Sequence, residues 1–128
     1  MVFHVITIFP RFFEGPFGCG IVGRARDSGI VDIRFHDPRE CTTDRHRTVD
    51  DRPFGGDEGM VIKIEPVFES LEKIRQTWPG KRTRTILLSA QGRCFDQAAA
   101  ARWARCDEIA FICGRYEGVD ERINTYLA

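Results

Sequence analysis

Two short apolar segments that end in glycine-containing turns constrain the fold of this chain more than any other feature. Residues 109–112 are continuously apolar and run through Cys113 into the turn 114–118 (GRYEG). Residues 85–88 run in the same way into the turn 89–93 (SAQGR). Apolar runs of this length are typical of strands buried on both faces of a sheet. Because ligands bind beyond the carboxyl ends of such strands, the two turns predict one shared pocket.

The other segments alternate between strand-like and helix-like patterns, which predicts an α/β fold with a mostly parallel sheet and flanking helices. In residues 30–36, apolar positions alternate with Asp32, Arg34 and His36, so this strand has one wet face and lies near a sheet edge. We expect strands over residues 2–9, 30–36, 84–88 and 108–113, and helices over residues 18–28, 65–78, 97–105 and from 120 onward.

The composition indicates one globular domain without an obvious polyanionic partner. A chain of 128 residues with 42% hydrophobic and 30% charged residues is expected to pack a core rather than stay disordered. The 19 Lys and Arg residues balance 19 Asp and Glu residues, so net charge does not favour nucleic acid. The five cysteines form no Cys-x-x-Cys pair, which indicates reduced thiols and a cytoplasmic protein. No apolar run is long enough for a membrane span.

The turn 114–118 has the residue types of a small-molecule site. Its two glycines let a ligand approach the backbone, Tyr116 can cover a flat ring, and Glu117 can bind an amine or a cation. The pattern matches neither a G-x-G-x-x-G fingerprint nor a P-loop, which favours an adenosine without phosphates over a nucleotide. The same pattern also fits an ordinary strand-to-helix turn.

The polar segment 37–59 is too long for a simple connection and has no regular period. Arg45, Arg47 and Arg52 have the guanidinium groups that hold RNA phosphates, and Asp50 can accept a hydrogen bond from a base edge. The alternative for such a mixture of charges is a solvated surface held by ion pairs.

Metal-dependent hydrolysis and cysteine nucleophilic catalysis are two other chemistries that the residues could suggest. His46 with Asp50 and Asp51 would suit a metal-dependent phosphohydrolase, although the spacing matches no known ligand set, and we expect no metal site. Cys94 and Cys113 lack a histidine nearby in sequence, so we expect both to be buried structural thiols rather than nucleophiles.

Several blocks of the sequence, in order along the chain, resemble the bacterial tRNA (guanine-N1)-methyltransferases. The longest are residues 44–56 (DRHRTVDDRPFGG) and 113–122 (CGRYEGVDER). Shorter blocks are residues 9–10 (FP), 23–25 (GRA), 59–60 (GM) and 88–93 (LSAQGR).

The resemblance implies an enzyme that methylates the guanosine on the 3′ side of the tRNA anticodon with S-adenosylmethionine. It also implies a SPOUT-type fold, in which a trefoil knot holds the cofactor, and a homodimer that binds tRNA across both subunits. A magnesium ion is left open as a second cofactor. A non-enzymatic RNA-binding or dimerisation module is the alternative that the sequence leaves open.

The resemblance also implies roles for individual residues. Glu117 would be catalytic or positioning, near the sulfonium and the target base. The expected cofactor-binding residues are Leu88, Ser89, Ala90, Gln91, Gly114, Tyr116, Glu117 and Gly118. The expected tRNA-binding residues are Arg24, His46, Asp50, Arg52 and Gly59.

The chain departs from the family pattern in three ways. Ala90 stands where the family usually has proline, and the glycine-rich stretch 55–59 is more acidic than usual. The resemblance covers only about the first half of the family. We therefore expect residues 1–128 to be the N-terminal S-adenosylmethionine-binding catalytic domain, with an incomplete knot, no C-terminal helical domain, a general base outside this chain and no activity alone.

Overall fold

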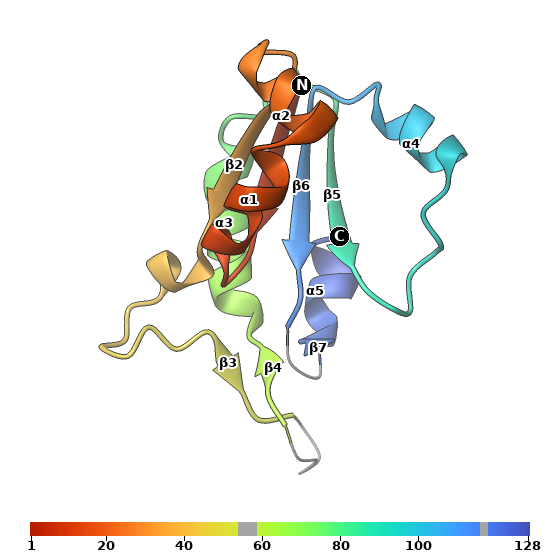
Figure 1. Cartoon of the computed structure of the whole chain (residues 1–128). Helices are drawn as coiled ribbons and strands as arrows, with labels where there is room; N and C mark the ends of the chain where they lie inside the picture. The colour runs from red at the N-terminus through yellow and green to blue at the C-terminus, as the bar shows by residue number, and fades with distance from the viewer. Residues whose placement is uncertain (54–58, 116–117) are drawn as a thin grey trace.

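A four-stranded parallel sheet forms the centre of the computed structural model, which describes residues 1–53, 59–115 and 118–128 (Figure 1). The strand order is β2-β1-β6-β5, and every neighbouring pair is parallel. The strands are β1 (Val2–Ile6), β2 (Asp32–His36), β5 (Thr83–Leu88) and β6 (Glu108–Cys113). The predicted α/β class is confirmed, and β2 is an edge strand as its alternating pattern indicated.

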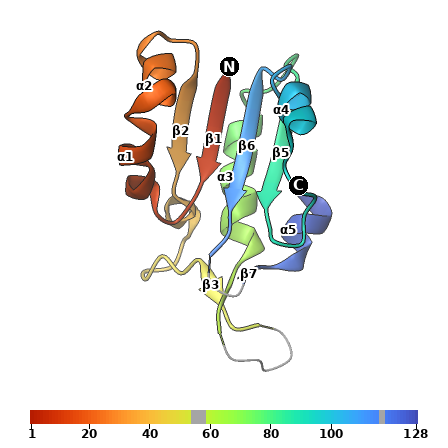
Figure 2. The same ribbon diagram turned by 45° about the vertical axis from the view of Figure 1, so that its right-hand side comes forward.

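Helices lie on both sides of this sheet. The helix α3 (Ile64–Arg75) packs against one face, while η1 (Pro10–Phe13), α1 (Glu14–Phe17) and α2 (Gly20–Asp27) lie on the other side near β2 (Figure 2). The helix α4 (Gln97–Trp103) begins at Asp96, whose carboxylate accepts a hydrogen bond from the Ala99 backbone N–H. The helix α5 (Glu121–Tyr126) follows the turn 114–118. Each described helix is too short or too polar to cross a membrane.

A second, smaller sheet joins the long polar segment to the glycine-containing turn. It consists of β3 (Asp50–Asp51), β4 (Val61–Ile62) and β7 (Gly118–Val119), in the order β3-β4-β7. The polar segment, predicted to be irregular, therefore contains a short strand as well as η2 (Pro38–Cys41). Strands of two residues carry no periodic pattern, so the sequence could not reveal them.

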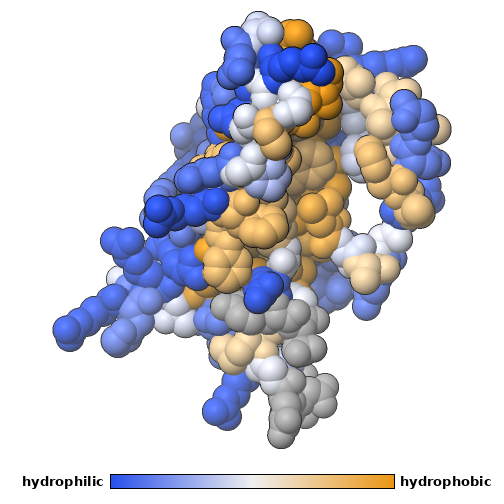
Figure 3. All heavy atoms as spheres, in the orientation of Figure 1, coloured by the Kyte–Doolittle hydropathy of each residue, from blue (hydrophilic) through white to orange (hydrophobic). Residues whose placement is uncertain are grey.

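The hydrophobic core lies between α3 and the sheet. Ile6, Ala110 and Ile112 project from β1 and β6 toward Leu71 and Ile74 of α3, and all five are nearly inaccessible to solvent. The opposite face carries a stack of Phe3 on Phe111, with ring centroids 6.1 Å apart. Figure 3 shows apolar side chains gathered on that side of the molecule. The two faces follow from the alternation of side chains along each strand.

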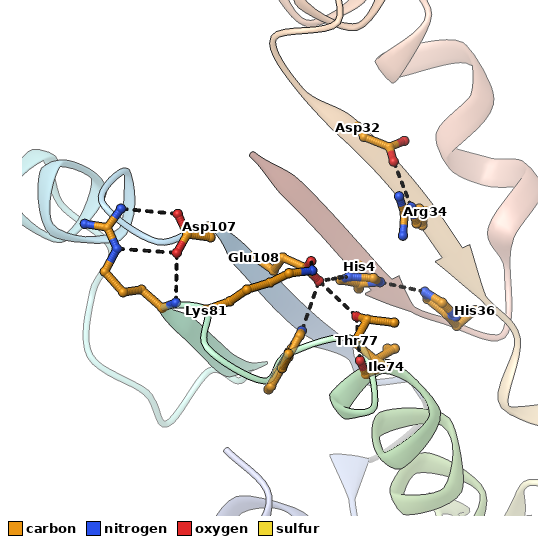
Figure 4. A network of polar contacts seen from close by, with 11 residues as sticks. His4, Asp32, Arg34, His36, Ile74, Thr77, Lys81, Asp107 and Glu108 are labelled. Carbon is orange, nitrogen blue, oxygen red and sulfur yellow. Dashed lines mark hydrogen bonds and ion pairs between the residues drawn. The ribbon is translucent and has the colours of Figure 1, made fainter.

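The predicted wet face of the edge strand is correct in part. Asp32 and Arg34 are exposed and pair with each other at 2.7 Å. His36 contradicts the prediction, because its Nε2 lies 3.0 Å from Nδ1 of the buried His4 (Figure 4). Parallel pairing of β2 with β1 puts the two histidines on the same face, toward α3. We refer to the buried His4 and Glu108, together with their less buried partners, as the buried polar cluster; the partners are His36, Thr77, Trp78 and Lys81.

Glu108 is the centre of the buried polar cluster. It is 3% exposed and accepts hydrogen bonds from His4 Nε2 at 2.8 Å, from Trp78 and Thr77, and from Lys81. Burial alone would raise the pKa of Glu108, but the bonds from Lys81 and His4 outweigh it and lower the pKa to about 2. Because the carboxylate only accepts, His4 donates from Nε2, and its Nδ1 pairs with Nε2 of His36.

Candidate functional site

A cavity of about 340 Å³ lies at the carboxyl ends of β5 and β6, where the sequence predicts a pocket. Both turns contribute to it, because β5 and β6 are adjacent and their last residues, Leu88 and Cys113, are paired. Two residues of α5 complete the wall. The lining residues are Leu87, Leu88, Ser89, Ala90, Gln91, Gly114, Arg115, Gly118, Val119, Glu121 and Asn124.

Two glycines shape this cavity for physical reasons. A Cβ on Gly114 would lie 3.2 Å from Val119 Cγ1, so glycine lets the turn lie against β7. Gly118 has a φ of +148°, a backbone conformation that side chains disfavour. It begins β7, which pairs with β4, so this conformation directs the chain from the turn into the small sheet.

The turn after β5 is closed by its own serine. Ser89 Oγ accepts a hydrogen bond from the Gln91 backbone N–H at 3.2 Å, and the Ser89 carbonyl accepts one from Gly92 N–H at 3.2 Å. Both bonds form without the proline that the family usually has at position 90. Ser89, Ala90 and Gln91 are all exposed, so their polar groups remain accessible to a ligand.

A second cavity, of about 570 Å³, lies beside the first at the carboxyl end of β1. The two cavities share Gly114 and Arg115, and the second is lined mainly by apolar residues such as Phe9 and Phe13. The Arg115 guanidinium carbon lies 5.3 Å from the Phe9 ring centroid, which directs this cation toward the second cavity.

Cys113 lines the second cavity and is half-buried, so the prediction that it is a buried thiol holds only in part. Burial raises its pKa, so the thiol keeps its proton. This agrees with the interpretation of Cys113 as unreactive. The companion prediction for Cys94 is wrong, because Cys94 is exposed in the connection between β5 and α4.

Six of the residues predicted to bind the cofactor lie together around the 340 Å³ cavity: Leu88, Ser89, Ala90, Gln91, Gly114 and Gly118. The other two, Tyr116 and Glu117, lie outside the described residues. Glu117 is also the residue predicted to be catalytic. The placement brings both turns into one site, while the role of each residue stays a prediction.

Glu121 and Asn124, which form the α5 wall of the cavity, were not predicted as site residues from the sequence. Asn124 Nδ2 donates to Glu121 Oε1 at 2.7 Å, across one turn of the helix. Their i, i+3 spacing places them on one helix face, but the same spacing occurs on any solvent-exposed face, so the sequence alone does not identify them.

The residues predicted to bind tRNA do not line the cavity and fall into two groups. Arg24 is exposed on α2, beside the edge strand. His46 and Arg52 are exposed and Asp50 is half-buried, all in the segment that leads to the small sheet, and Gly59 follows beyond the undescribed stretch 54–58. The undescribed stretch holds most of the acidic glycine-rich segment.

Asp44 organises the turn that presents His46. Its carboxylate accepts hydrogen bonds from the Thr48 hydroxyl at 2.8 Å, from Thr48 N–H at 3.0 Å and from His46 N–H at 3.2 Å. The bonds from the Thr48 side chain and backbone lower the pKa of Asp44. Arg47 has a positive φ of 52° in this turn. Arg45, His46 and Arg47 consequently project from an ordered turn and are exposed.

The geometry gives no support to metal chemistry. Within residues 1–53, 59–115 and 118–128, no group of three His, Cys, Asp or Glu side chains could hold a metal ion. The phosphohydrolase built on His46, Asp50 and Asp51 therefore lacks the ligand cluster that it requires, and nothing favours a magnesium ion.

Comparisons with known proteins agree on one family. The family description "tRNA (Guanine-1)-methyltransferase TrmD" matches residues 1–128. The tRNA (guanine-N(1)-)-methyltransferase of Koribacter versatilis is 54% identical over 100% of this chain and 49% of its own length. That of Geobacter metallireducens is 48% identical over 96% of this chain and 49% of its own length. The chain thus spans about half the length of the curated relatives it matches.

A solved structure extends the agreement to the fold. The crystal structure of the tRNA (m1G37) methyltransferase from Aquifex aeolicus has a TM-score of 0.84 and 34% sequence identity, covering 98% of this chain and 56% of that chain. The predicted SPOUT-type fold class is confirmed by this similarity. With a family match over every residue and relatives at about half identity, this chain belongs to the tRNA (guanine-1)-methyltransferase family.

Proposed function

We propose that this chain carries the S-adenosylmethionine-binding part of an enzyme that methylates N1 of the guanosine 3′ of the tRNA anticodon. The observation that carries the proposal is the cavity at the ends of β5 and β6, formed by the two turns that hold the family's motifs. The names of the relatives and of the Aquifex aeolicus structure supply the reaction and the substrate class.

The cavity suits an adenosine that carries a short charged tail. Leu88 and Val119 offer apolar surface to a purine, and the exposed turn at Ser89 and Gln91 offers hydrogen bonds to sugar or base edges. Among the described lining residues, Arg115 is the only cation, which fits a ligand without phosphates. When bound, S-adenosylmethionine supplies the methyl group from its sulfonium.

The reaction places further demands on the protein. Guanine N1 carries a proton, so a base must remove it, and N1 must be held in line with the methyl group. We assign Glu117 a catalytic or positioning role through its place in the family motif. We assign the general base and the completion of the knot to the half of the family's length that this chain does not span.

The tRNA is proposed to contact the exposed Asp44–Thr48 turn together with Arg24 and Arg52. Arginines on an ordered turn hold phosphates at low conformational cost. A homodimer that shares one tRNA, and a cytoplasmic location where tRNA is found, complete the proposal. Both follow from the family and not from a contact in the structure.

The test uses this chain and a chimera in which it replaces the matching half of the Koribacter versatilis relative. We expect the chimera to bind S-adenosylmethionine in calorimetry and to methylate a tRNA with guanosine 3′ of the anticodon. We expect this chain alone to be inactive. A tRNA with adenosine at that position is the matched substrate control.

A chimera that folds but neither binds S-adenosylmethionine nor methylates the guanosine tRNA would contradict the proposal. Binding of tRNA without any thermal shift from S-adenosylmethionine would favour the alternative, a non-enzymatic RNA-binding module. Detectable methylation by this chain alone would show that the general base lies within residues 1–128.

A further inference from the structure

The wall of the cavity formed by α5 points to how the charged tail of the cofactor is bound. We propose that Glu121 binds the α-ammonium group of S-adenosylmethionine and that Asn124 positions its carboxylate. This inference rests on the proposed function, since it assigns a residue to one end of the same ligand. Both residues belong to the cavity lining.

The Glu121 carboxylate is held in place without being neutralised. Asn124 Nδ2 donates to one oxygen, Oε1, at 2.7 Å. The neighbouring cation Arg122 is engaged elsewhere, 2.6 Å from Asp120 Oδ2 and 3.7 Å from Glu65 Oε1. In the described part of the chain, no cationic side chain forms an ion pair with Glu121. A fixed carboxylate with one oxygen available is suited to accept from an ammonium.

The charge of the described lining is consistent with a cationic ligand group at this wall. Glu121 is the one carboxylate among the lining residues that the structure describes. The only described cation in the lining, Arg115, has its guanidinium over the Phe9 ring, on the side of the second cavity. Arg115 therefore does not cancel the negative charge on the α5 wall.

The exposed position of Glu121 favours the α-ammonium, and not the sulfonium, as the group that its carboxylate binds. Glu121 and Asn124 are both exposed, so this wall lies at the mouth of the cavity. An ammonium is strongly hydrated and loses least by binding where water remains. The sulfonium must instead reach the target base in a geometry that excludes water from the reaction.

The experiment compares Glu121→Gln with the unchanged protein, in this chain and in the chimera, by calorimetry with three ligands. S-Adenosylmethionine has both the sulfonium and the α-ammonium, S-adenosylhomocysteine keeps only the α-ammonium, and 5′-methylthioadenosine has neither. We expect Glu121→Gln to weaken the first two about tenfold each, because a charge-assisted bond becomes a neutral one. We expect 5′-methylthioadenosine to bind unchanged.

Matched variants separate this role from a general effect. Glu69→Gln removes an exposed glutamate of α3 that lies outside the cavity, and this variant is expected to bind all three ligands normally. Asn124→Ala should weaken the two amino-acid-bearing ligands by a smaller factor, about threefold, because the carboxylate remains but is less fixed. Thermal unfolding of each variant checks that it is folded.

Several outcomes would overturn the inference while leaving the proposed function intact. Equal binding of S-adenosylmethionine by Glu121→Gln and the unchanged protein would show that the carboxylate is not a ligand. A loss for S-adenosylmethionine alone would place the carboxylate at the sulfonium. An equal loss for all three ligands would indicate damage to the cavity. If neither this chain nor the chimera binds any adenosyl ligand without a substitution, the result contradicts the proposed function itself.

Discussion

The buried polar cluster and the candidate cavity are two gatherings of polar side chains in one small protein, and they differ in how their hydrogen bonds are used. In the buried cluster, Glu108 receives four donors, and His4 bonds on both ring nitrogens. In the cavity, Ser89 is bonded within its own turn, whereas Glu121 keeps an oxygen without a described partner.

This difference separates a structural role from a binding role. A buried polar group must be paired, because leaving it without a partner is costly, and in the described residues no buried side-chain polar atom lacks one. Groups at the cavity are exposed, so water can be exchanged for a ligand at little cost. Hydrogen-bond pairing therefore predicts that changes to the buried cluster affect folding, and that changes to the cavity affect binding.

The largest expected effect comes from Glu108→Ala. Removing this carboxylate leaves His4, Trp78 and Lys81 without their shared acceptor, and we expect the free energy of unfolding to fall by about 3–5 kcal/mol. Urea denaturation measures it. The control is Asp107→Ala, which removes the neighbouring carboxylate from an exposed pair with Arg82 and should cost much less. Equal losses for the two variants would show that burial does not distinguish the cluster.

The next prediction concerns the pH dependence of stability. Burial, then the charge effects of His4 and Arg34, lowers the pKa of His36 to about 4, below the 6.5 of an ordinary histidine. The unfolded chain therefore binds a proton that folded His36 resists, and stability should decrease as pH falls from 6.5 toward 4. Allowing for the partial exposure of the ring, we expect a loss of about 1–2 kcal/mol.

The variant His36→Gln tests the origin of this pH effect. Its amide can still form a hydrogen bond with His4 Nδ1, as donor or acceptor, but does not titrate, so the loss between pH 6.5 and 4 should be reduced. Urea midpoints at several pH values compare the two proteins. Below the carboxyl pKa of the unfolded chain, both should lose stability further as pH falls toward the Glu108 pKa of about 2. An unchanged slope in His36→Gln would assign the effect to other groups.

A pair of glycine variants tests whether the cavity turn is specialised for binding. Gly118 and Gly80 both have positive φ, +148° and +77°, and no atom of the described residues lies within 4 Å of a Cβ added to either. Alanine should therefore cost each about 1–2 kcal/mol through backbone strain alone. Only Gly118→Ala should weaken S-adenosylmethionine binding to the chimera, by about three- to tenfold. Equal binding by both variants would mean that the turn tolerates the strain without reshaping the cavity.

The smallest expected effect is that of Ser89→Ala. The hydroxyl closes an exposed turn through one bond from Gln91 N–H, so stability should fall by only about 0.5 kcal/mol. Binding of S-adenosylmethionine should weaken by about two- to threefold in calorimetry. Ser28→Ala, at the exposed end of α2, is the control and should change neither quantity. A larger loss of stability than of binding would place Ser89 with the structural residues.

The sequence predicted the elements better than their limits. The strand expected over residues 2–9 ends at Ile6, although Ile8 is still buried. An apolar run indicates that residues are buried, whereas a strand also requires hydrogen bonds to a neighbouring strand. Here the burial continues beyond the last paired residue. The helices predicted from capping and periodicity appear as α2, α3, α4 and α5, each shifted or shortened at its ends by a few residues.

The candidate site was likewise predicted from the sequence only in part. Both turns could be predicted because glycine and polar residues directly after apolar runs leave a local pattern. Glu121 and Asn124 leave none that separates them from a solvent-exposed helix face, and only the cavity identifies them. Likewise, the alternation around His36 indicated a water-facing side chain, and only the pairing of β2 with β1 revealed its partner.

By itself, the sequence determined the α/β class, the pair of turns that form one pocket and, through its motif blocks, the family. These properties depend on residues close together along the chain. The tertiary structure decided which polar groups are already paired and which remain available to a ligand. That distinction depends on partners such as His4 and Glu108, which are 104 residues apart and meet only because β1 lies beside β6. Hydrogen-bond pairing over such distances has no local signature, so it appears only when the chain is folded.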